Sequence, residues 1–118
     1  MPAVFGEKRK TMTLYFLRAP NNHLKIGISD NFPNRLDQIR RGNSHQPIEV
    51  VQTFSADRET ISQLERDIHA ELDSYRIHHE WFEWNQEAEA VISRLMLQFF
   101  PERFVISQEP SSPVQVQA

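Results

Sequence analysis

The alternation of apolar and polar positions near the start of the chain predicts a β-hairpin. Residues 13–19 are rich in aromatic and apolar side chains, and in residues 23–29 the apolar Leu24, Ile26 and Ile28 alternate with His23, Lys25 and Gly27. Runs of this kind favour strands, and the Pro-Asn-Asn between them consists of turn-forming residues. We therefore expect the apolar side of the second strand to face a core, with Lys25 and Gly27 on the opposite side.

Three later stretches have the 3.6-residue period of amphipathic helices. The first begins with the capping sequence Asp30-Asn31-Phe32-Pro33 and stops near Gly42. The second runs from Asp57 to about Tyr75, and the third follows Asn85 and ends at Pro101. Their apolar faces are, in order, Phe32, Leu36 and Ile39; Ile61, Leu64, Ile68, Leu72 and Tyr75; and Ala88, Val91, Ile92, Leu95, Met96 and Phe99.

Together these elements predict an α/β fold. Residues 48–54 make a third strand, and His78 to Trp84 is a short aromatic segment that we expect to be extended. The order β-β-α-β-α-(β)-α indicates a small three-stranded antiparallel sheet flanked by helices. We expect a domain at residues 13–104, a basic N-terminal lead at residues 1–12, and a disordered tail at residues 105–118, whose polar composition cannot offset the entropy of ordering.

Composition narrows the classes of protein. The 118 residues include no cysteine, which excludes disulfides and thiolate chemistry, and no apolar run approaches the length of a membrane span. Without a signal segment, we expect a cytoplasmic protein that has no contact with membranes. The net charge is -3, yet basic residues dominate from residue 8 to residue 41 and acidic residues from Glu49 to Glu89. This asymmetry allows one positive face, although a mixed surface is an equally simple interpretation.

Glu65 departs from the helical pattern, because it lies beside Ile61 and Ile68 rather than on the solvated side. A carboxylate at the edge of a buried stripe needs a cation, a hydrogen-bond donor or a metal as partner. His69, one turn further on, lies on the same flank, and an arginine such as Arg35 is the simplest alternative partner.

Other chemical candidates are the arginines of the first helix and a cluster before the third. Arg35 could bind a phosphate or lie with its stem over the core, and Arg40 and Arg41 complement the helix dipole without any ligand. His78, His79 and Glu80 make a weak metal site, because neighbours in an extended segment point to opposite sides. Trp81, Phe82 and Trp84 could stack on bases, but their position between two helices favours packing in a core.

These residues and their spacing resemble a known family. Leu14-Tyr15, followed about ten residues later by Lys25-Ile26-Gly27, is similar to the paired motifs that name the GIY-YIG nucleases. Arg35 stands where that family carries its helix arginine. The stretch from Glu65 to Phe82, with His69, Arg76 and Glu80, resembles the phage-associated DNA-binding branch described as open-reading-frame-172-like.

The resemblance implies a site for DNA phosphodiester hydrolysis that uses Mg²⁺ or Mn²⁺. Glu65 would match the metal-ligating glutamate and Arg35 the arginine that stabilises the transition state. Tyr15 would match the first-motif tyrosine, and Gly27 the second-motif glycine. Lys25, Arg35, Arg40 and Arg41 are the expected DNA contacts, whereas Gly27, Arg76, Glu80 and Phe82 are motif positions with a structural role.

One departure from the family pattern leaves alternatives open. Lys25 stands where many members have a tyrosine proposed to deprotonate the attacking water. The general base is then Lys25 with a lowered pKa, Tyr15 or His69. The expected function is a metal-dependent DNA endonuclease, and the alternatives are a DNA-binding module that does not cut and a protein-interaction adaptor. Specificity would come from a homodimer, a recruiting protein partner or DNA shape.

Overall fold

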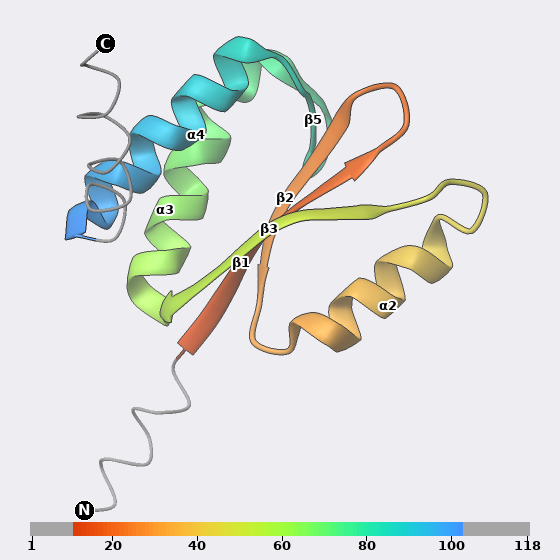
Figure 1. The fold of residues 1–118 in the computed structure, drawn as a ribbon, viewed down its shortest axis with the longest axis horizontal. Coiled ribbons are helices and arrows are strands. Elements are labelled where there is room, and N and C mark those ends of the chain that lie inside the picture. The colour runs from red at the N-terminus through yellow and green to blue at the C-terminus, as the bar shows by residue number, and fades with distance from the viewer. Residues whose placement is uncertain (1–10, 103–118) are drawn as a thin grey trace, which may run out of the picture.

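The computed structural model of the chain describes residues 11–102. The predicted tail at residues 105–118, and all but the last two residues of the predicted lead, lie outside these described residues. Within them, a twisted sheet separates two helical layers (Figure 1), with helix α2 (Phe32–Gly42) on one side and helices α3 (Arg58–Glu71) and α4 (Gln86–Phe99) on the other. The α/β fold expected from the sequence is therefore confirmed.

The sheet is wider than the sequence predicts. Its order is β3-β1-β2-β5-β4, formed by β1 (Thr11–Ala19), β2 (His23–Ser29), β3 (Glu49–Asp57), β4 (Arg76–His78) and β5 (Trp81–Glu83). All pairings are antiparallel. Within the aromatic segment expected to be extended from His78 to Trp84, residues Trp81–Glu83 form β5, whereas β4 begins earlier, at Arg76, where no strand was expected. Strands of three residues are too short to leave a readable alternation, and β5 is held by its pairing with β2.

Local chemistry explains where the elements begin and turn. Asn21 and Asn22 both have positive φ, which a β-hairpin turn of this hand requires and which asparagine tolerates. The side chains of Asn31, Asp57 and Asn85 cap the three helices by accepting hydrogen bonds from backbone N–H groups three residues further on. The last turn of the predicted second helix is a separate 3-10 turn, η1 (Asp73–Tyr75).

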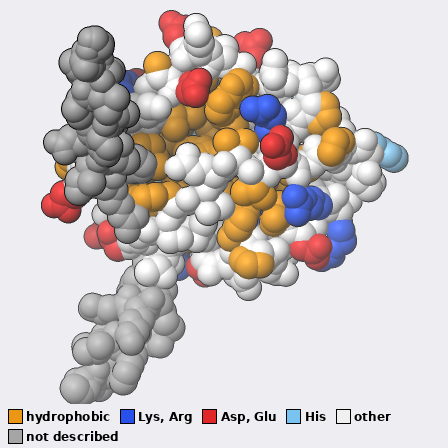
Figure 2. All heavy atoms as spheres, in the orientation of Figure 1, with side chains coloured by type: hydrophobic (Ala, Val, Ile, Leu, Met, Phe, Trp, Pro, Cys, Tyr) orange, Lys and Arg blue, Asp and Glu red, His pale blue; other side chains and the backbone are white. Residues whose placement is uncertain are grey.

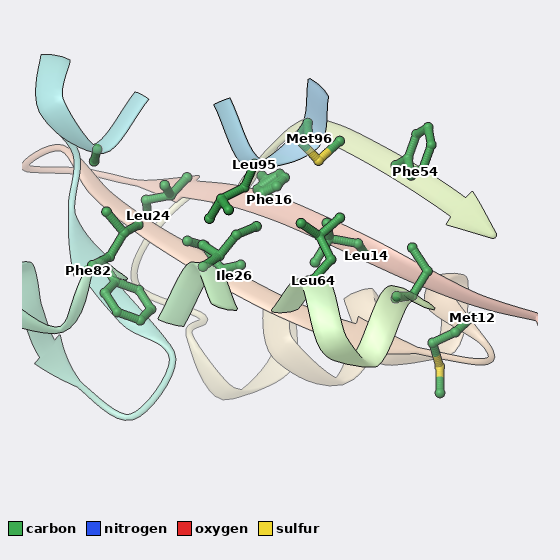
Figure 3. Close-up of a cluster of buried hydrophobic side chains, with 14 residues drawn as sticks. Met12, Leu14, Phe16, Leu24, Ile26, Phe54, Leu64, Phe82, Leu95 and Met96 are labelled. Atoms are coloured by element: carbon green, nitrogen blue, oxygen red, sulfur yellow. The ribbon is translucent and has the colours of Figure 1, made fainter. Parts of the chain in front are cut away.

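The main core lies between the sheet and the α3/α4 layer. Leu14, Phe16, Leu24 and Ile26 project from β1 and β2 toward the apolar faces of α3 and α4 (Figure 3). The alternate residues of β1, including Tyr15 and Leu17, pack in a second cluster against α2. Tyr15 pairs with Gly27, and Lys25 is two residues from Gly27, so the side chains of Tyr15 and Lys25 share the α2 face of the sheet.

The surface over the strands is mixed in character. Figure 2 shows hydrophobic side chains gathered along the middle of this view, with lysine and arginine side chains visible over α2. Among residues 11–102, no helix is long and apolar enough to cross a membrane.

Candidate functional site

The candidate site lies at the end of the pairing between strands β2 and β5. β5 pairs with β2 from His23 to Lys25, and the next contact is a hydrogen bond of 3.1 Å from Ile26 N to the Glu80 carbonyl. The Ile26 carbonyl has a side chain as its partner, His69 Nε2 at 2.9 Å. Beyond this point the edge of β2 is open, and side chains from α2 on one face and α3 on the other both reach it.

A cavity of about 550 Å³ occupies this edge, and we call it the charged cavity. It is lined by Lys25, Arg35, Glu65, His69, Arg76, His78, His79, Glu80 and Trp81. Arg35 and Glu65, from helices on opposite faces of the sheet, thus border one space. They do not form an ion pair with each other among the contacts of residues 11–102, so the simplest partner suggested for Glu65 is not the one it has.

Lys25 is the charged residue that the fold buries. Its exposed fraction is 8%, and within residues 11–102 it is the only charged or polar residue in the buried class. Its ammonium group lies 3.4 Å from Glu80 Oε1 and 5.2 Å from the ring centre of Trp81. A buried ammonium without partners would be costly, and this carboxylate and this aromatic face are the partners that Lys25 has.

Glu80 is only partly satisfied by this pair. The 3.4 Å contact is an ion-pair distance, but Glu80 Oε1 is buried and makes no hydrogen bond. Buried polar atoms in native proteins nearly always have a hydrogen-bond partner. An oxygen left in this state beside an open cavity is positioned to take a donor or a cation from outside the chain.

Glu65 lies beside His69, with 3.6 Å between Oε2 and Nε2. Burial raises the pKa of the Glu65 carboxyl group above its ordinary value, His69 opposes this shift, and the negative charge of Glu80 adds to it. Since a carbonyl oxygen can only accept, His69 Nε2 carries a proton and donates it to the Ile26 carbonyl. His69 therefore fixes the position of Glu65 and closes the sheet edge at the same time.

Tyr15 lies beneath the cavity and orients Arg35. Its ring is 1% exposed, and its hydroxyl accepts a hydrogen bond of 3.4 Å from Arg35 Nε. Burial raises the pKa of Tyr15, only partly opposed by the Arg35 hydrogen bond, so the phenol stays protonated at neutral pH. The same hydrogen bond raises the pKa of Arg35, which is always charged in any case.

Gly27 gives Tyr15 and Glu80 the room they occupy. A Cβ atom at this position would lie 2.5 Å from the Tyr15 hydroxyl oxygen and 2.7 Å from Glu80 Oε1. The two oxygens thus meet over a residue without a side chain, and the glycine is needed for close approach rather than for a positive φ.

We predict that Gly27→Ala destabilises the protein by about 1–3 kcal/mol, because a buried tyrosine ring and its neighbour must move. Chemical denaturation measures this change in the free energy of unfolding. Gly42→Ala is the matched control: nothing lies within 4 Å of its added Cβ, and alanine favours the helix by roughly 0.5–1 kcal/mol. Equal stability of the two variants would contradict the close packing of Tyr15 and Glu80 over Gly27.

The other predicted residues lie outside or at the border of the charged cavity. Arg40 donates to the Ile48 carbonyl from Nε and Nη2, and Arg41 pairs with Asp37, so neither guanidinium lines the cavity. Arg76 lies over the ring of the fully buried Phe82 and donates to the His79 carbonyl, which fixes the β4–β5 turn. DNA binding by Arg40 and Arg41 stays a prediction.

Sequence reasoning missed the direct place of Glu80, Trp81, His78 and His79 in the cavity. Glu80 was expected to have a structural role, and Trp81 was assigned to a core, whereas the ring is half-buried at the cavity border. The strands Arg76–His78 and Trp81–Glu83 leave only His79 and Glu80 for the turn between them, and the segment predicted from His78 began too late to include the first of these strands.

The two carboxylates fit a hard divalent ion such as Mg²⁺ or Mn²⁺. Both supply oxygen donors, Glu80 Oε1 lacks a hydrogen bond, and the charge of Glu80 raises the pKa of Glu65, a repulsion that a cation would relieve. Within residues 11–102 no three His, Asp or Glu side chains form a metal-binding group. Water and a phosphate would then complete the shell, as is usual for Mg²⁺.

Fold and cavity together define a small α/β domain with a charged site at a sheet edge. The profile of the T5orf172 domain family matches residues 12–96, and the chain belongs to this family. The match confirms the resemblance to the open-reading-frame-172-like branch, and the family is compatible with a nuclease-like or DNA-binding module. No curated protein and no solved structure matches the chain.

Proposed function

We propose that the chain is a DNA endonuclease of the GIY-YIG type that hydrolyses phosphodiester bonds with Mg²⁺ or Mn²⁺. The observation that carries the proposal is the meeting of the Arg35 guanidinium and the carboxylates of Glu65 and Glu80 at one open cavity. Opposite charges brought together without pairing to each other suit a substrate that needs both, namely a phosphate with its counterion.

Each residue of the charged cavity has a separate role in this proposed reaction. Glu65 would hold the metal ion, which when bound neutralises phosphate charge and assists the leaving oxygen. Arg35, held by the Tyr15 hydroxyl, stabilises the negative charge that develops on the phosphate oxygens. Arg76 and Lys25 add positive charge at the border, where the DNA backbone enters.

We assign Glu80 as the acceptor of the proton from the attacking water. Of the three bases considered from the sequence, Lys25 is occupied by its contact with Glu80, Tyr15 has a raised pKa that keeps its proton, and His69 Nε2 is a donor. Glu80 Oε1 borders the cavity, lies 3.4 Å from the Lys25 ammonium and makes no hydrogen bond, so it has a lone pair to accept that proton. Lys25 in the tyrosine position thus acts through Glu80.

Incubation of the purified protein with supercoiled plasmid is expected to yield nicked or linear DNA in Mg²⁺ or Mn²⁺, and none in EDTA. Gel electrophoresis of duplex, branched and single-stranded substrates measures the cutting. Binding should weaken steeply as salt rises, because phosphate contacts release counterions.

A DNA-binding module without catalysis is the second candidate, and the replacement of the expected tyrosine by an ion-paired Lys25 favours it. Salt-sensitive binding without metal-dependent nicking on any of these substrates would establish that function. If the protein neither binds nor cuts DNA, the protein-interaction adaptor is the function that remains. A homodimer or a recruiting protein partner as the source of specificity stays a prediction.

A further inference from the structure

A second, smaller hollow adjoins the charged cavity on the α2 face of the sheet. Its volume is about 170 Å³, and Trp81 and His78 line both spaces. Beyond this shared border the lining changes from charged groups to Ile77, Asn43, Gln46 and His23. We call this space the small hollow.

Trp81 stands between two different environments. Lys25, a residue of the charged cavity, lies over its ring at 5.2 Å from the centre. The half-buried ring also contributes to the small hollow, together with Ile77. Ile77 has an exposed fraction of 45%, the highest among the exposed large hydrophobic residues of the described chain. An aromatic ring and an exposed aliphatic side chain next to a charged site give a flat apolar ligand a place to lie.

The rest of the lining supplies hydrogen-bonding groups. Asn43 is held at the end of α2 by a hydrogen bond of 2.8 Å from Nδ2 to the Ile39 carbonyl, and Gln46 and His23 lie at the same hollow. Amide side chains pair well with the edges of nucleobases, and aromatic rings stack on their faces. A lipid chain would use only the apolar surface and leave the amide groups without partners.

We propose that the small hollow binds one unpaired nucleobase of a DNA strand whose phosphate lies in the charged cavity. The placement of that phosphate rests on the proposed function, and the shared border of the two spaces at Trp81 and His78 selects the neighbouring nucleotide as the occupant. Bases inside an intact duplex are stacked and paired and cannot enter such a space. The substrate class is therefore DNA with an unpaired base beside the reacting phosphate, such as a single strand, a flap, a gap or a mismatch.

Metal-free binding of two short oligonucleotides tests the proposal. One is oligothymidylate, and the other has the same length and charge but abasic sites in place of the bases. The chain has two tryptophans, so Trp84→Phe leaves Trp81 as the only one. In EDTA we expect oligothymidylate to bind about tenfold more tightly than the abasic strand, as one stacked base provides, and to quench Trp81 fluorescence.

Ile77→Ala is expected to lower affinity for oligothymidylate several-fold and to leave affinity for the abasic strand unchanged. Its exposed position makes the variant safe for folding, and Val50→Ala, at 39% exposure on β3, is the matched control that changes neither. Equal affinities for the two strands, no quenching, or no binding of either strand would overturn the proposal. Because metal is absent, failure of plasmid cutting does not affect this result, and cutting without base-dependent binding would leave the proposed function standing alone.

Discussion

Glu65→Gln is expected to abolish metal-dependent cutting, with a loss of at least about 10³-fold in rate. The carboxylate is the proposed metal ligand, and a neutral amide of the same shape removes the charge while keeping the packing beside His69. DNA binding in EDTA should persist, because the basic side chains at the cavity remain. Cutting is measured on plasmid, and metal affinity by calorimetric titration with Mn²⁺, which does not depend on turnover.

The same substitution should stabilise the metal-free protein. The folded state raises the pKa of Glu65, so it binds the proton more tightly than the unfolded state does. This contribution to stability is fully present below the pKa of the unfolded chain and is lost as pH rises through the folded pKa. At neutral pH the ionised Glu65 therefore destabilises the fold, and Glu65→Gln should raise the melting temperature by roughly 2–5 °C.

Glu59→Gln is the control for both effects. Glu59 lies on the same helix, is exposed and does not line the charged cavity, so cutting, Mn²⁺ affinity and stability should stay close to those of the wild type. A Glu65→Gln variant that still binds Mn²⁺ and cuts at the wild-type rate would remove Glu65 from the metal site. Metal affinity that does not increase with pH would contradict the role of its ionised form.

Most of the fold could be predicted because its elements are long enough to show a period. The first strand of the hairpin is a nine-residue run rich in apolar side chains, the second alternates over seven residues, and each helix has several turns with an apolar face and a capping side chain. β4 and β5 have three residues each, and they are held by pairing with each other and with β2 and by the contact of Arg76 with Phe82 rather than by a local pattern. Strands of three residues are too short to show a hydrophobic period in the sequence.

The candidate site was predictable in part for the same reason. Glu65 and Arg35 broke the pattern of well-defined helices, which made them visible. Glu80 and Trp81 lie in a segment that has no pattern to break. Their roles depend on the β2–β5 register, which places Trp81 opposite Lys25 and brings Glu80 over Gly27. The sequence also could not show that Arg40 hydrogen-bonds to the Ile48 carbonyl, because that contact joins helix α2 to the residue before β3 in the folded chain.

Arg35→Ala is expected to lower the cutting rate by about 10²–10³-fold, the usual effect of removing one preorganised donor from a transition state. The guanidinium is held in place before substrate arrives, by Tyr15 through Nε and by Gln38 through Nη1. Arg35→Lys should recover little of the loss, because an ammonium group cannot donate to Tyr15 and to two phosphate oxygens in one plane.

Binding measurements separate this role from simple attraction of DNA. Removal of one phosphate contact should reduce the slope of log affinity against log salt by about one, whereas the catalytic loss is much larger than the loss of affinity. Arg41→Ala is the matched control from the same helix, since Arg41 pairs with Asp37 and does not line the charged cavity. If Arg35→Ala and Arg41→Ala reduce cutting equally, helix α2 contributes only general positive charge. Another cation of the charged cavity would then stabilise the transition state.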